Sequence, residues 1–427
     1  MPTIYLNNFR GFKETYLTLK EINFFVGENS TGKTSILKLI KLLSDHRFWF
    51  NFDFNIEDAE LGYFSEIVCK QNKEKFFEIG ILGDERDKLK AISAIKLTFK
   101  NNEGQVELQN LRFIREKYEI EINLANKNYQ YRFQKIDLKN VIESNKMKYY
   151  KFWLLNNPLS NKTYKNIKTP PNIPNNVLFF NLLSFIEKEQ KILDFGFQLP
   201  SFLEDVVCVA PIRTEPKRTY DSYKIKYSSD GSHIPYILKQ LLTKNKNKEK
   251  INHILNKFGE DSGLWDKIEI NQLGSDSTSP FELIIFIKGI PFKINNVGYG
   301  VSQILPLVVE ILARGNHNWF AIQQPEIHLH PRSQAAFGEF IYKTYVTEQK
   351  KFIIETHSDF LIDRLRIRFN LDNEIKKDIA QVVYFEKKEG NNVLSCIQIN
   401  SDGTYSDEQP ASFKEFFLKE QLSLLNL

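Results

Sequence analysis

The apolar positions of this chain follow two different patterns. Short continuous apolar runs, typical of buried parallel strands, occur at residues 22–26, 319–322 and 352–354, and helical spacing follows each run. Between residues 76 and 133 apolar and polar residues alternate instead, which predicts an antiparallel meander. Its strands are expected at 76–82, 94–99, 105–108, 118–122 and 129–133. The pattern thus predicts an α/β fold with a mixed central sheet and an antiparallel β lobe.

The sequence between about residues 142 and 176 is polar and rich in lysine and asparagine, and we interpret it as an exposed linker or insertion. An alternative arises because interleaved aromatic and basic side chains can stack on single-stranded nucleic acid. The residues of that alternative are Tyr149, Tyr150, Lys151, Phe152 and Trp153.

Further elements follow from the same periodicities. Helices are expected at 177–195, 234–242, 251–258, 304–313 and 359–369, strands at 205–209, 380–386 and 393–399, a hairpin at 281–294 and an amphipathic helix at 413–427. The lysine run at 244–250 is interpreted as a solvated helix end, with contact to a DNA backbone as the alternative.

Composition limits the class of protein. The chain has 427 residues, 42% of them hydrophobic, which is enough to form a core. Its net charge of +5 permits contact with nucleic acid without arguing for it, and its 3 cysteines indicate no metal or disulfide framework. Because we find no signal peptide and no stretch of transmembrane length, we expect a cytoplasmic protein without a membrane partner.

The strongest motif is a phosphate-binding loop between the strand at 22–26 and a helix. It fits the pattern G-x-x-x-x-G-K-[ST], in which backbone N–H groups and a lysine bind phosphates and a hydroxyl ligates Mg²⁺. The predicted nucleotide-binding residues are Gly27, Asn29, Ser30, Thr31, Gly32, Lys33, Thr34 and Ser35, with Thr34 as the Mg²⁺ ligand. The loop indicates ATP or GTP without choosing between them.

A second group of motifs lies in the last third of the chain. Gly298, Gly300 and Ser302 precede the helix at 304–313, which is typical of an anion site at a helix start. The strands at 319–322 and 352–354 both end in polar residues, at the edge where parallel α/β sheets bind ligands. We therefore expect both strand ends to face the phosphates held by the loop.

Together these motifs resemble ABC-type ATPases of the SMC/RecF kind within the AAA family. The closer resemblance is to stand-alone ATPases related to the overcoming-lysogenization-defect proteins of bacterial anti-phage operons. It is carried by Asn8–Arg10, the loop, Ala210–Arg213 with Pro216, Arg218 and Tyr220, and then Gly298–Pro306, Pro325–Pro331 and Glu355–Ser358. The resemblance implies an ABC-type P-loop ATPase head with an inserted helical lobe, and it favours ATP over GTP.

The resemblance also assigns roles. Ser302 matches the signature motif, which reaches the nucleotide of a second subunit in trans, and Ile327–His330 match the D-loop. His357 matches the switch histidine that senses the γ-phosphate, and Arg10 stands where such ATPases place a residue near the nucleotide. For His328 and His330 the alternatives are metal binding or simple packing.

One departure from the family concerns catalysis. Where ABC ATPases carry the Walker B aspartate and the catalytic glutamate, this chain has Gln323 and Gln324. Gln323 is a neutral and therefore poor Mg²⁺ ligand, and a glutamine cannot act as a general base. Glu326 is the expected replacement base, and Gln324 is expected to orient the attacking water. We predict slow ATP hydrolysis, with binding but no hydrolysis as the alternative.

These observations predict four segments. Residues 1–140 form the first part of the ATPase head, 141–295 an inserted, mostly helical lobe, 296–400 the motif-rich part of the core and 401–427 a tail. After His357 we find no TOPRIM pattern and no other nuclease motif. The resemblance thus predicts an ATP-controlled regulator of a separate nuclease, as in Septu and PARIS systems.

The predicted assembly is a homodimer or a higher even-numbered homo-oligomer. The alternative function is a RecF/SMC-like ATPase that binds DNA in repair, and nucleic acid stays a possible partner. A transporter subunit is disfavoured by the motif spellings.

Overall fold

The computed structural model describes residues 2–71, 75–83, 92–115, 118–124, 129–136, 148–167, 175–190, 203, 206–221, 226–243, 246–276, 279–372 and 378–416. The chain divides into two compact units. The first comprises Met1–Lys20, Glu28–Val206 and Phe385–Leu394, and the second Glu21–Gly27, Val207–Tyr384 and Ser395–Leu427. Within the described ranges, none of the helices has the length and hydropathy needed to cross a bilayer.

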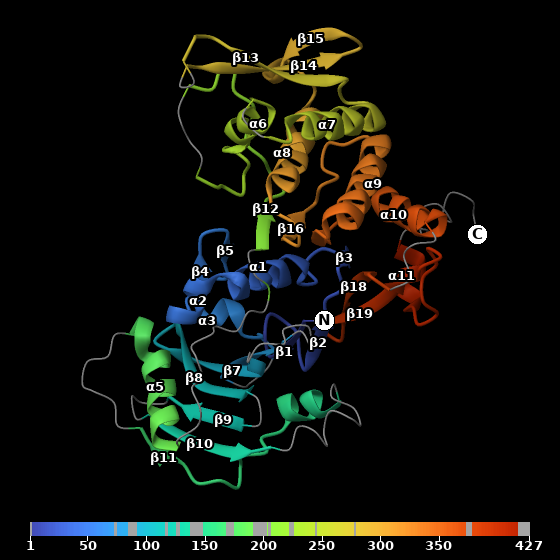
Figure 1. Ribbon diagram of the computed structural model, residues 1–427. Coiled ribbons are helices and arrows are strands. Elements are labelled where there is room, and N and C mark those ends of the chain that lie inside the picture. The colour runs from blue at the N-terminus through green and yellow to red at the C-terminus, as the bar shows by residue number, and fades with distance from the viewer. Residues whose placement is uncertain are drawn as a thin grey trace. The chain divides into compact units, whose positions relative to one another are not determined.

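The first unit contains an eight-stranded sheet, seen as the blue and cyan arrows of Figure 1. Its order is β11 (Lys165–Asn166), β10 (Gln130–Lys135), β9 (Tyr118–Asn123), β8 (Gln105–Arg115), β7 (Ile92–Asn102), β6 (Phe76–Leu82), β1 (Thr3–Asn7) and β2 (Thr15–Thr18). Every pair is antiparallel. The turn from β7 to β8 uses Glu103 and Gly104, both at positive φ, as a tight hairpin requires. The predicted meander is confirmed.

The linker predicted at 142–176 is wrong in part, because residues 148–155 are helical. Trp153 is fully buried, and its indole N–H donates to Glu119 at 2.6 Å while the Arg112 guanidinium lies 4.4 Å from its ring. Tyr150 is buried as well, so neither ring is available to stack on nucleic acid. Phe152 remains 55% exposed.

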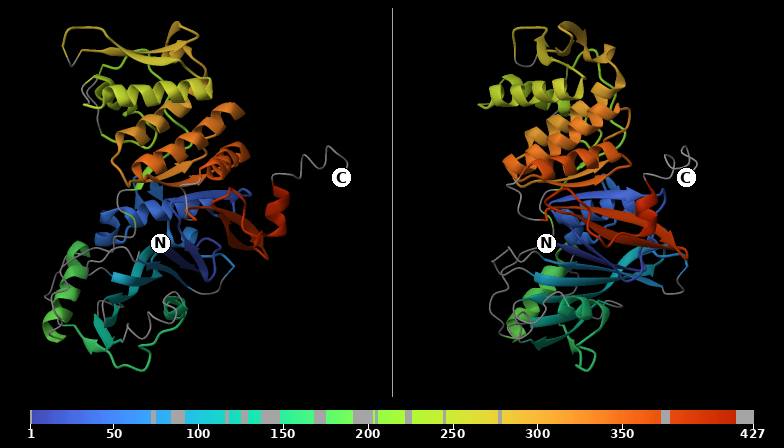
Figure 2. Two further views of the ribbon diagram at one scale, coloured as in Figure 1. Left: turned by 45° about the vertical axis from the view of Figure 1, so that its right-hand side comes forward. Right: turned by 90° about the vertical axis from the view of Figure 1, so that its right-hand side faces the viewer.

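The first unit also holds the helices α1 (Lys33–Ser44), α2 (His46–Asn51), α3 (Phe64–Ile67) and α5 (Asn175–Gln190) and the short hairpin β4 (Asn55–Ile56) and β5 (Ala59–Glu60). In Figures 1 and 2, α5 runs along the sheet formed by β8, β9 and β10. The end predicted for this helix, residues 191–195, lies outside the described residues.

The second unit is built on a six-stranded sheet. Its order is β12 (Val206–Val209), β16 (Trp319–Gln323), β17 (Lys351–Glu355), β3 (Ile22–Gly27), β18 (Ala380–Lys388) and β19 (Asn391–Ile399). β16, β17 and β3 are parallel, whereas the tight turn between β18 and β19 makes that pair antiparallel. The α/β fold with a mixed central sheet and an antiparallel lobe is thus confirmed.

A buried amide chain ties the middle of this sheet together. The Asn23 side chain donates to the Phe352 carbonyl at 3.1 Å, and Gln381 donates to Asn23 at 2.8 Å. Because buried amides must find partners, these bonds disfavour a shift in the register of β17, β3 and β18.

The remaining elements of the second unit are α6 (Ile234–Thr243), α7 (Lys248–Ser262), η2 (Ile294–Asn296), α8 (Tyr299–Ala313), α9 (Pro331–Glu348), α10 (Asp359–Leu371) and α11 (Ala411–Phe416). They also include a three-stranded sheet of β13 (Lys267–Gln272), β14 (Phe281–Ile287) and β15 (Ile290–Lys293), which packs against α7 in Figure 1. β13 was missed, so the segment predicted as mostly helical also contains a sheet. Of the helix predicted at 413–427, the part after Phe416 lies outside the described residues.

Candidate functional site

The predicted phosphate loop connects the buried strand β3 to α1. Gly27, Ser30 and Gly32 have φ of 141°, 63° and 94°, so the backbone turns sharply three times within six residues. Glu28, Asn29 and Ser30 are exposed, Thr31 is buried, and Thr34 and Ser35 lie at the start of α1 with Thr34 exposed. This succession of left-handed and helical conformations directs backbone N–H groups toward one side, as in anion-binding nests.

Lys33 is a second feature of the loop that fits a phosphate, besides its backbone N–H groups. It is only 4% exposed, and its ammonium donates to the carbonyl of Glu28 at 2.6 Å. The side chain thus folds back over the loop that would surround a phosphate. Thr31 donates to the same carbonyl at 2.7 Å and stiffens the turn. A positive charge, backbone N–H groups and the N-terminus of α1 together fit the triphosphate of a nucleotide.

Gly32 is required by its surroundings as well as by its φ. A Cβ at this position would lie 2.6 Å from the Phe12 ring and 3.1 Å from the Asn392 amide. Asn392 also donates to the carbonyl of Arg10 at 2.8 Å. The N-terminal Asn8–Arg10 segment therefore supports the loop through its backbone.

The Arg10 side chain is placed differently from what its predicted role suggests. Its guanidinium donates to the Leu61 carbonyl. Burial lowers the pKa of Arg10, and the charge of Glu66 opposes that change. Its assignment as a nucleotide-binding residue stays a prediction.

The second group of predicted residues gathers at the carboxyl ends of β16 and β17. Gln323 and Glu355 are register partners, and the Gln324 N–H donates to the Glu355 carbonyl at 2.8 Å. Gln324 has a φ of 42°, unusual for a residue other than glycine, so the chain turns sharply after the strand. Gln323 and Gln324 are both partly exposed, and each carries an amide oxygen that can accept from water.

Glu326 is held by the segment that follows β17. One carboxylate oxygen accepts the His357 N–H at 2.7 Å, and the other accepts the Thr356 hydroxyl at 2.9 Å. Thr356 in turn donates its N–H to the Phe25 carbonyl of β3 at 3.1 Å. Glu326 and His357 are thus brought together as expected, but through the backbone of His357 and not through its ring.

Arg213 stands beside this group and was quoted from the sequence without a role. It is 3% exposed, and one guanidinium nitrogen donates to the Gln323 carbonyl at 3.3 Å. Burial lowers the pKa of Arg213 to about 10, while the charge of Glu326 opposes that change. An arginine shortly after the apolar strand β12 was the signal that could have identified it.

The three histidines of the predicted site differ in their surroundings. His357 is exposed, and its ring stacks on Phe416 at 6.5 Å between centroids. His330 caps the start of α9 by accepting from Arg332, and the His328 ring lies 5.4 Å from that of Tyr299. Across the described ranges no cluster of three potential metal ligands occurs, and these contacts agree with the packing alternative for His328 and His330.

The signature segment forms the first turn of α8, which begins earlier than predicted. Ser302 is 5% exposed, and its hydroxyl donates to the Tyr299 carbonyl at 2.8 Å. The Tyr299 hydroxyl donates to Glu215 at 2.7 Å, a bond that raises the pKa of Tyr299. Gly300 has little free space, since a Cβ there would lie 3.3 Å from the His328 carbonyl. The signature and D-loop segments are therefore in direct contact within the second unit.

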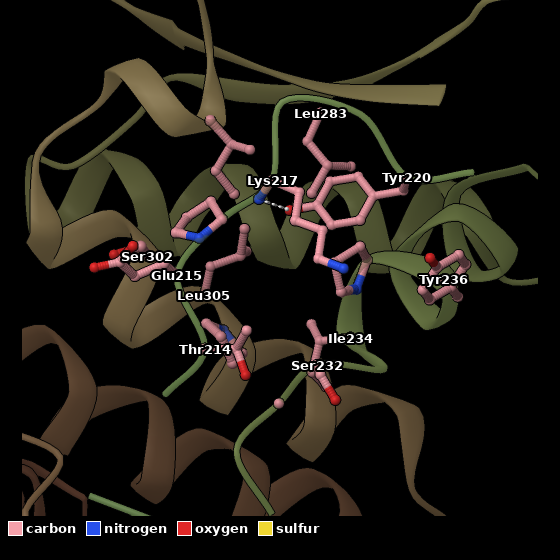
Figure 3. A pocket seen from close by; sticks show the side chains of 15 residues that line it. Thr214, Glu215, Lys217, Tyr220, Ser232, Ile234, Tyr236, Leu283, Ser302 and Leu305 are labelled. Atoms are coloured by element: carbon pink, nitrogen blue, oxygen red, sulfur yellow. Dashed lines mark hydrogen bonds between the residues drawn. The ribbon is translucent and has the colours of Figure 1, made fainter. Parts of the chain in front are cut away.

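A cavity of about 190 Å³ lies behind this turn (Figure 3). Ser302 and Leu305 of α8 line it together with the 214–220 segment, where the Lys217 N–H donates to the Tyr220 hydroxyl at 3.1 Å. In this conformation Ser302 faces the interior of the unit. Its predicted contact with a nucleotide in trans needs a rotation of the side chain or of the helix start.

Comparison with known proteins gives the family. A family model described as AAA ATPase domain matches residues 1–362. Two sequences of the DNA replication and repair protein RecF from Leptospira biflexa, strains of serovar Patoc, are 52% identical over 45 residues. That match covers 10% of this chain and 12% of RecF, so it concerns a short segment.

Solved structures of SMC heads are loosely similar. An SMC head bound to the C-winged helix domain of ScpA aligns over 93% of this chain and 98% of its own, at 11% identity and a TM-score of 0.43. The SMC head domain of Thermotoga maritima aligns over 92% and 97%, at 10% identity and a TM-score of 0.39. The assignment rests on the family model, which spans well over half of the chain. This chain belongs to the AAA ATPase domain family.

Proposed function

We propose that this protein is an ATP-controlled switch that hydrolyses ATP slowly, dimerises through its nucleotide sites and regulates a separate nuclease in bacterial anti-phage defence. The observation that carries the slow hydrolysis is the state of Glu326. Both of its carboxylate oxygens are engaged by Thr356 and His357, and Gln323 and Gln324 supply no carboxylate beside it. The nuclease and the defence role rest on the family resemblance of the motifs.

The loop residues bind and orient the nucleotide in this proposal. Lys33 moves its ammonium from the Glu28 carbonyl to the phosphates, and the backbone N–H groups of Gly32 and its neighbours bind the same oxygens. The Thr34 hydroxyl and the Gln323 amide oxygen are the groups that would hold Mg²⁺, which neutralises phosphate charge when it is bound.

The chain itself supplies the means to move a proton. Gln324 orients the attacking water through its amide, and a Glu326 oxygen accepts the proton of that water. Glu326 acts only after it exchanges its bond from Thr356 or His357 for the water, which makes hydrolysis slow. The carboxyl edge of the sheet is a suitable place for this reaction. β3, which leads into the loop at Gly27, is the parallel neighbour of β17.

The test is ATP turnover and ATP binding by the purified chain. We expect slow turnover that is lost in Lys33→Ala, which binds ATP about 10–100-fold more weakly, and that is abolished in Glu326→Gln while binding is kept. Binding without any turnover in the wild type would contradict hydrolysis and leave an ATP-held scaffold. A chain that does not bind ATP would contradict the whole proposal.

The regulatory part needs its own experiment. The chain is co-expressed with a nuclease encoded beside it, and DNA cleavage is measured with wild type and with Lys33→Ala. We expect a stoichiometric complex whose cleavage activity depends on ATP binding by this chain. Cleavage that is independent of both ATP and Lys33 would contradict the switch.

The match to RecF favours a second candidate, an ATPase that binds duplex DNA in repair. Such a protein should bind duplex DNA in the presence of ATP, with an affinity that falls steeply as salt is raised. Fluorescence anisotropy with a labelled duplex at several salt concentrations separates the two candidates. The absence of ATP-dependent binding would remove the repair function.

A further inference from the structure

The cation of Arg213 is enclosed and incompletely paired. The side chain is 97% buried, and within the described structure its Nε and one terminal nitrogen have no hydrogen-bond partner. Its one hydrogen bond is to the carbonyl of Gln323, at the tip of β16. A buried arginine is costly unless its charge is compensated, and the negative charge of Glu326 partly offsets the effect of burial.

The carboxylate of Glu326 joins two segments in turn. It accepts from Thr356 and His357, whose segment directly follows β17, while Glu326 itself follows β16. Arg213 reaches the same strand tip through Gln323. The segment after β12 is therefore bonded to the end of β16 by Arg213, and the segment after β16 is bonded to the segment after β17 by Glu326.

The Arg213 segment is also fixed to the signature helix. Two residues further along, Glu215 accepts the hydroxyl of Tyr299, the first residue of α8. Between them the Thr214 N–H donates to the Asp230 carbonyl at 2.9 Å. The start of α8 and Arg213 are thus joined through the three-residue segment 213–215.

We infer that Arg213 is a positioning residue that sets the orientation of Glu326, and that the 213–215 segment makes this orientation respond to the signature helix. When α8 engages a nucleotide, Arg213 shifts against Gln323 and Glu326 exchanges its partners on the His357 segment for the attacking water. The inference rests on the proposed function, because it concerns the regulation of the same carboxylate. It adds a connection, within one chain, between the signature helix and the Glu326 carboxylate.

The first experiment replaces the arginine. Arg213→Met removes the charge at similar length, and Arg213→Lys keeps the charge. We expect Arg213→Met to lower kcat by about 10–100-fold, the effect of a misplaced catalytic group, with the Kd for a fluorescent ATP analogue unchanged. Arg213→Lys should keep part of the kcat that Arg213→Met loses. Arg366→Met is the matched control, because Arg366 is a half-buried arginine of α10 with its bonds to Gly403 and Asp363, and it should leave kcat unchanged.

A second readout does not depend on turnover. The His357 N–H that binds Glu326 reports the position of the carboxylate through amide hydrogen exchange of the peptide covering residues 351–360. We expect faster exchange in Arg213→Met and in Glu326→Gln, and no change in Arg366→Met. If the wild type does not hydrolyse ATP, the hydrolysis proposal fails while this exchange measurement still decides the inference.

Tyr299→Phe tests the connection to the signature helix. Tyr299 is 55% exposed, so the variant keeps the fold and loses only the bond to Glu215. We expect a lower kcat with unchanged ATP binding and a faster exchange of the 351–360 peptide. If Arg213→Met does not fold, Arg213→Lys and Tyr299→Phe carry the test. Unchanged turnover together with unchanged exchange in these variants would overturn the inference.

Discussion

The starts of α1 and α8 have similar sequences and different structures. Both combine glycine with a hydroxyl residue at the first turn of a helix, which is typical of an anion site. At α1, Gly32 caps the helix in the left-handed conformation, and Thr34 is exposed. At α8, Gly298 caps the helix in an extended conformation, and Ser302 is buried with its hydroxyl bonded to Tyr299. The start of α1 thus has the conformation that a phosphate site requires, whereas the predicted contact of Ser302 with a phosphate would require a rearrangement of the start of α8.

The comparison is tested most strongly by removing the positive charge of the loop. We predict that Lys33→Ala weakens ATP binding by about 10–100-fold, since a charge-assisted hydrogen bond contributes about 1.5–3 kcal/mol. Titration with a fluorescent ATP analogue measures the change. Lys38→Ala is the control, because Lys38 lies on the same helix and bonds the Glu60 carbonyl. Equal losses in both variants would show that the effect is one of general charge.

The two capping glycines provide a direct contrast. Gly32→Ala places a Cβ against Phe12 at a φ of 94°, and such strain costs about 1–3 kcal/mol, so we expect about tenfold weaker binding and a lower Tm. Gly298→Ala meets no atom within 4 Å and should keep both values. Gly104→Ala, at a φ of 91° with open space, isolates the backbone strain from the steric clash. Similar binding losses in Gly32→Ala and Gly104→Ala would contradict the close-fit explanation.

The elements that could be predicted from the sequence are those whose residues form a local pattern along the chain. The loop could be identified because its glycines and Lys33 lie within eight residues, and the meander because its strands alternate along their length. Residues 148–155 were missed as a helix, although Tyr150, Trp153 and Leu154 recur at helical spacing and are buried. This apolar stripe is short, and the contacts that fix it, from Trp153 to Glu119 and from Arg112 to the Trp153 ring, join segments far apart in the sequence.

The arrangement around Glu326 lay beyond what the sequence could predict for a different reason. Arg213 and Gln323 are 110 residues apart, and the sheet order places β12 beside β16. That order is set by packing of the whole unit and not by either segment. β13 was a simpler omission, since Ile268 and Ile270 alternate with polar residues and gave the usual signal of a strand.

A smaller effect is predicted for the buried hydroxyl of Ser302 in α8. Ser302→Ala removes a group that bonds only within its own helix turn, so the variant should fold and bind ATP with unchanged affinity. Turnover and ATP-dependent dimer formation should fall by about three- to tenfold, because the hydroxyl's bond to the charged phosphate is partly offset by the bond to Tyr299 that it gives up. Analytical ultracentrifugation with and without ATP measures the dimer. A variant that dimerises and turns over like the wild type would remove Ser302 from the site in trans.

The smallest predicted effect is a loss of folding stability at low pH. It concerns Asp230, in the turn that binds the Thr214 N–H beside the signature helix. Partial burial alone would raise the pKa of Asp230, but hydrogen bonds from Ser228, from the Ser232 backbone and from Thr214 together lower it to about 2. A carboxyl whose pKa is lower in the folded state stabilises the fold above its ordinary value of 3.8, and that contribution is lost as the pH falls toward 2. Partial exposure limits its size to about 1 kcal/mol.

Asp230→Asn tests this contribution, because asparagine keeps an acceptor oxygen and cannot titrate. The wild type should be more stable than the variant at pH 6 by urea unfolding, and the difference should shrink as the pH falls from 3.8 toward about 2, where Asp230 becomes protonated in the folded state. The Lys33→Ala and Lys38→Ala variants keep Asp230, so their stability differences from the wild type should show no comparable shrinkage. If the stability difference between wild type and Asp230→Asn stays constant with pH, the Asp230 charge does not hold the Thr214 segment. The signature helix would then be supported by the Glu215–Tyr299 bond alone.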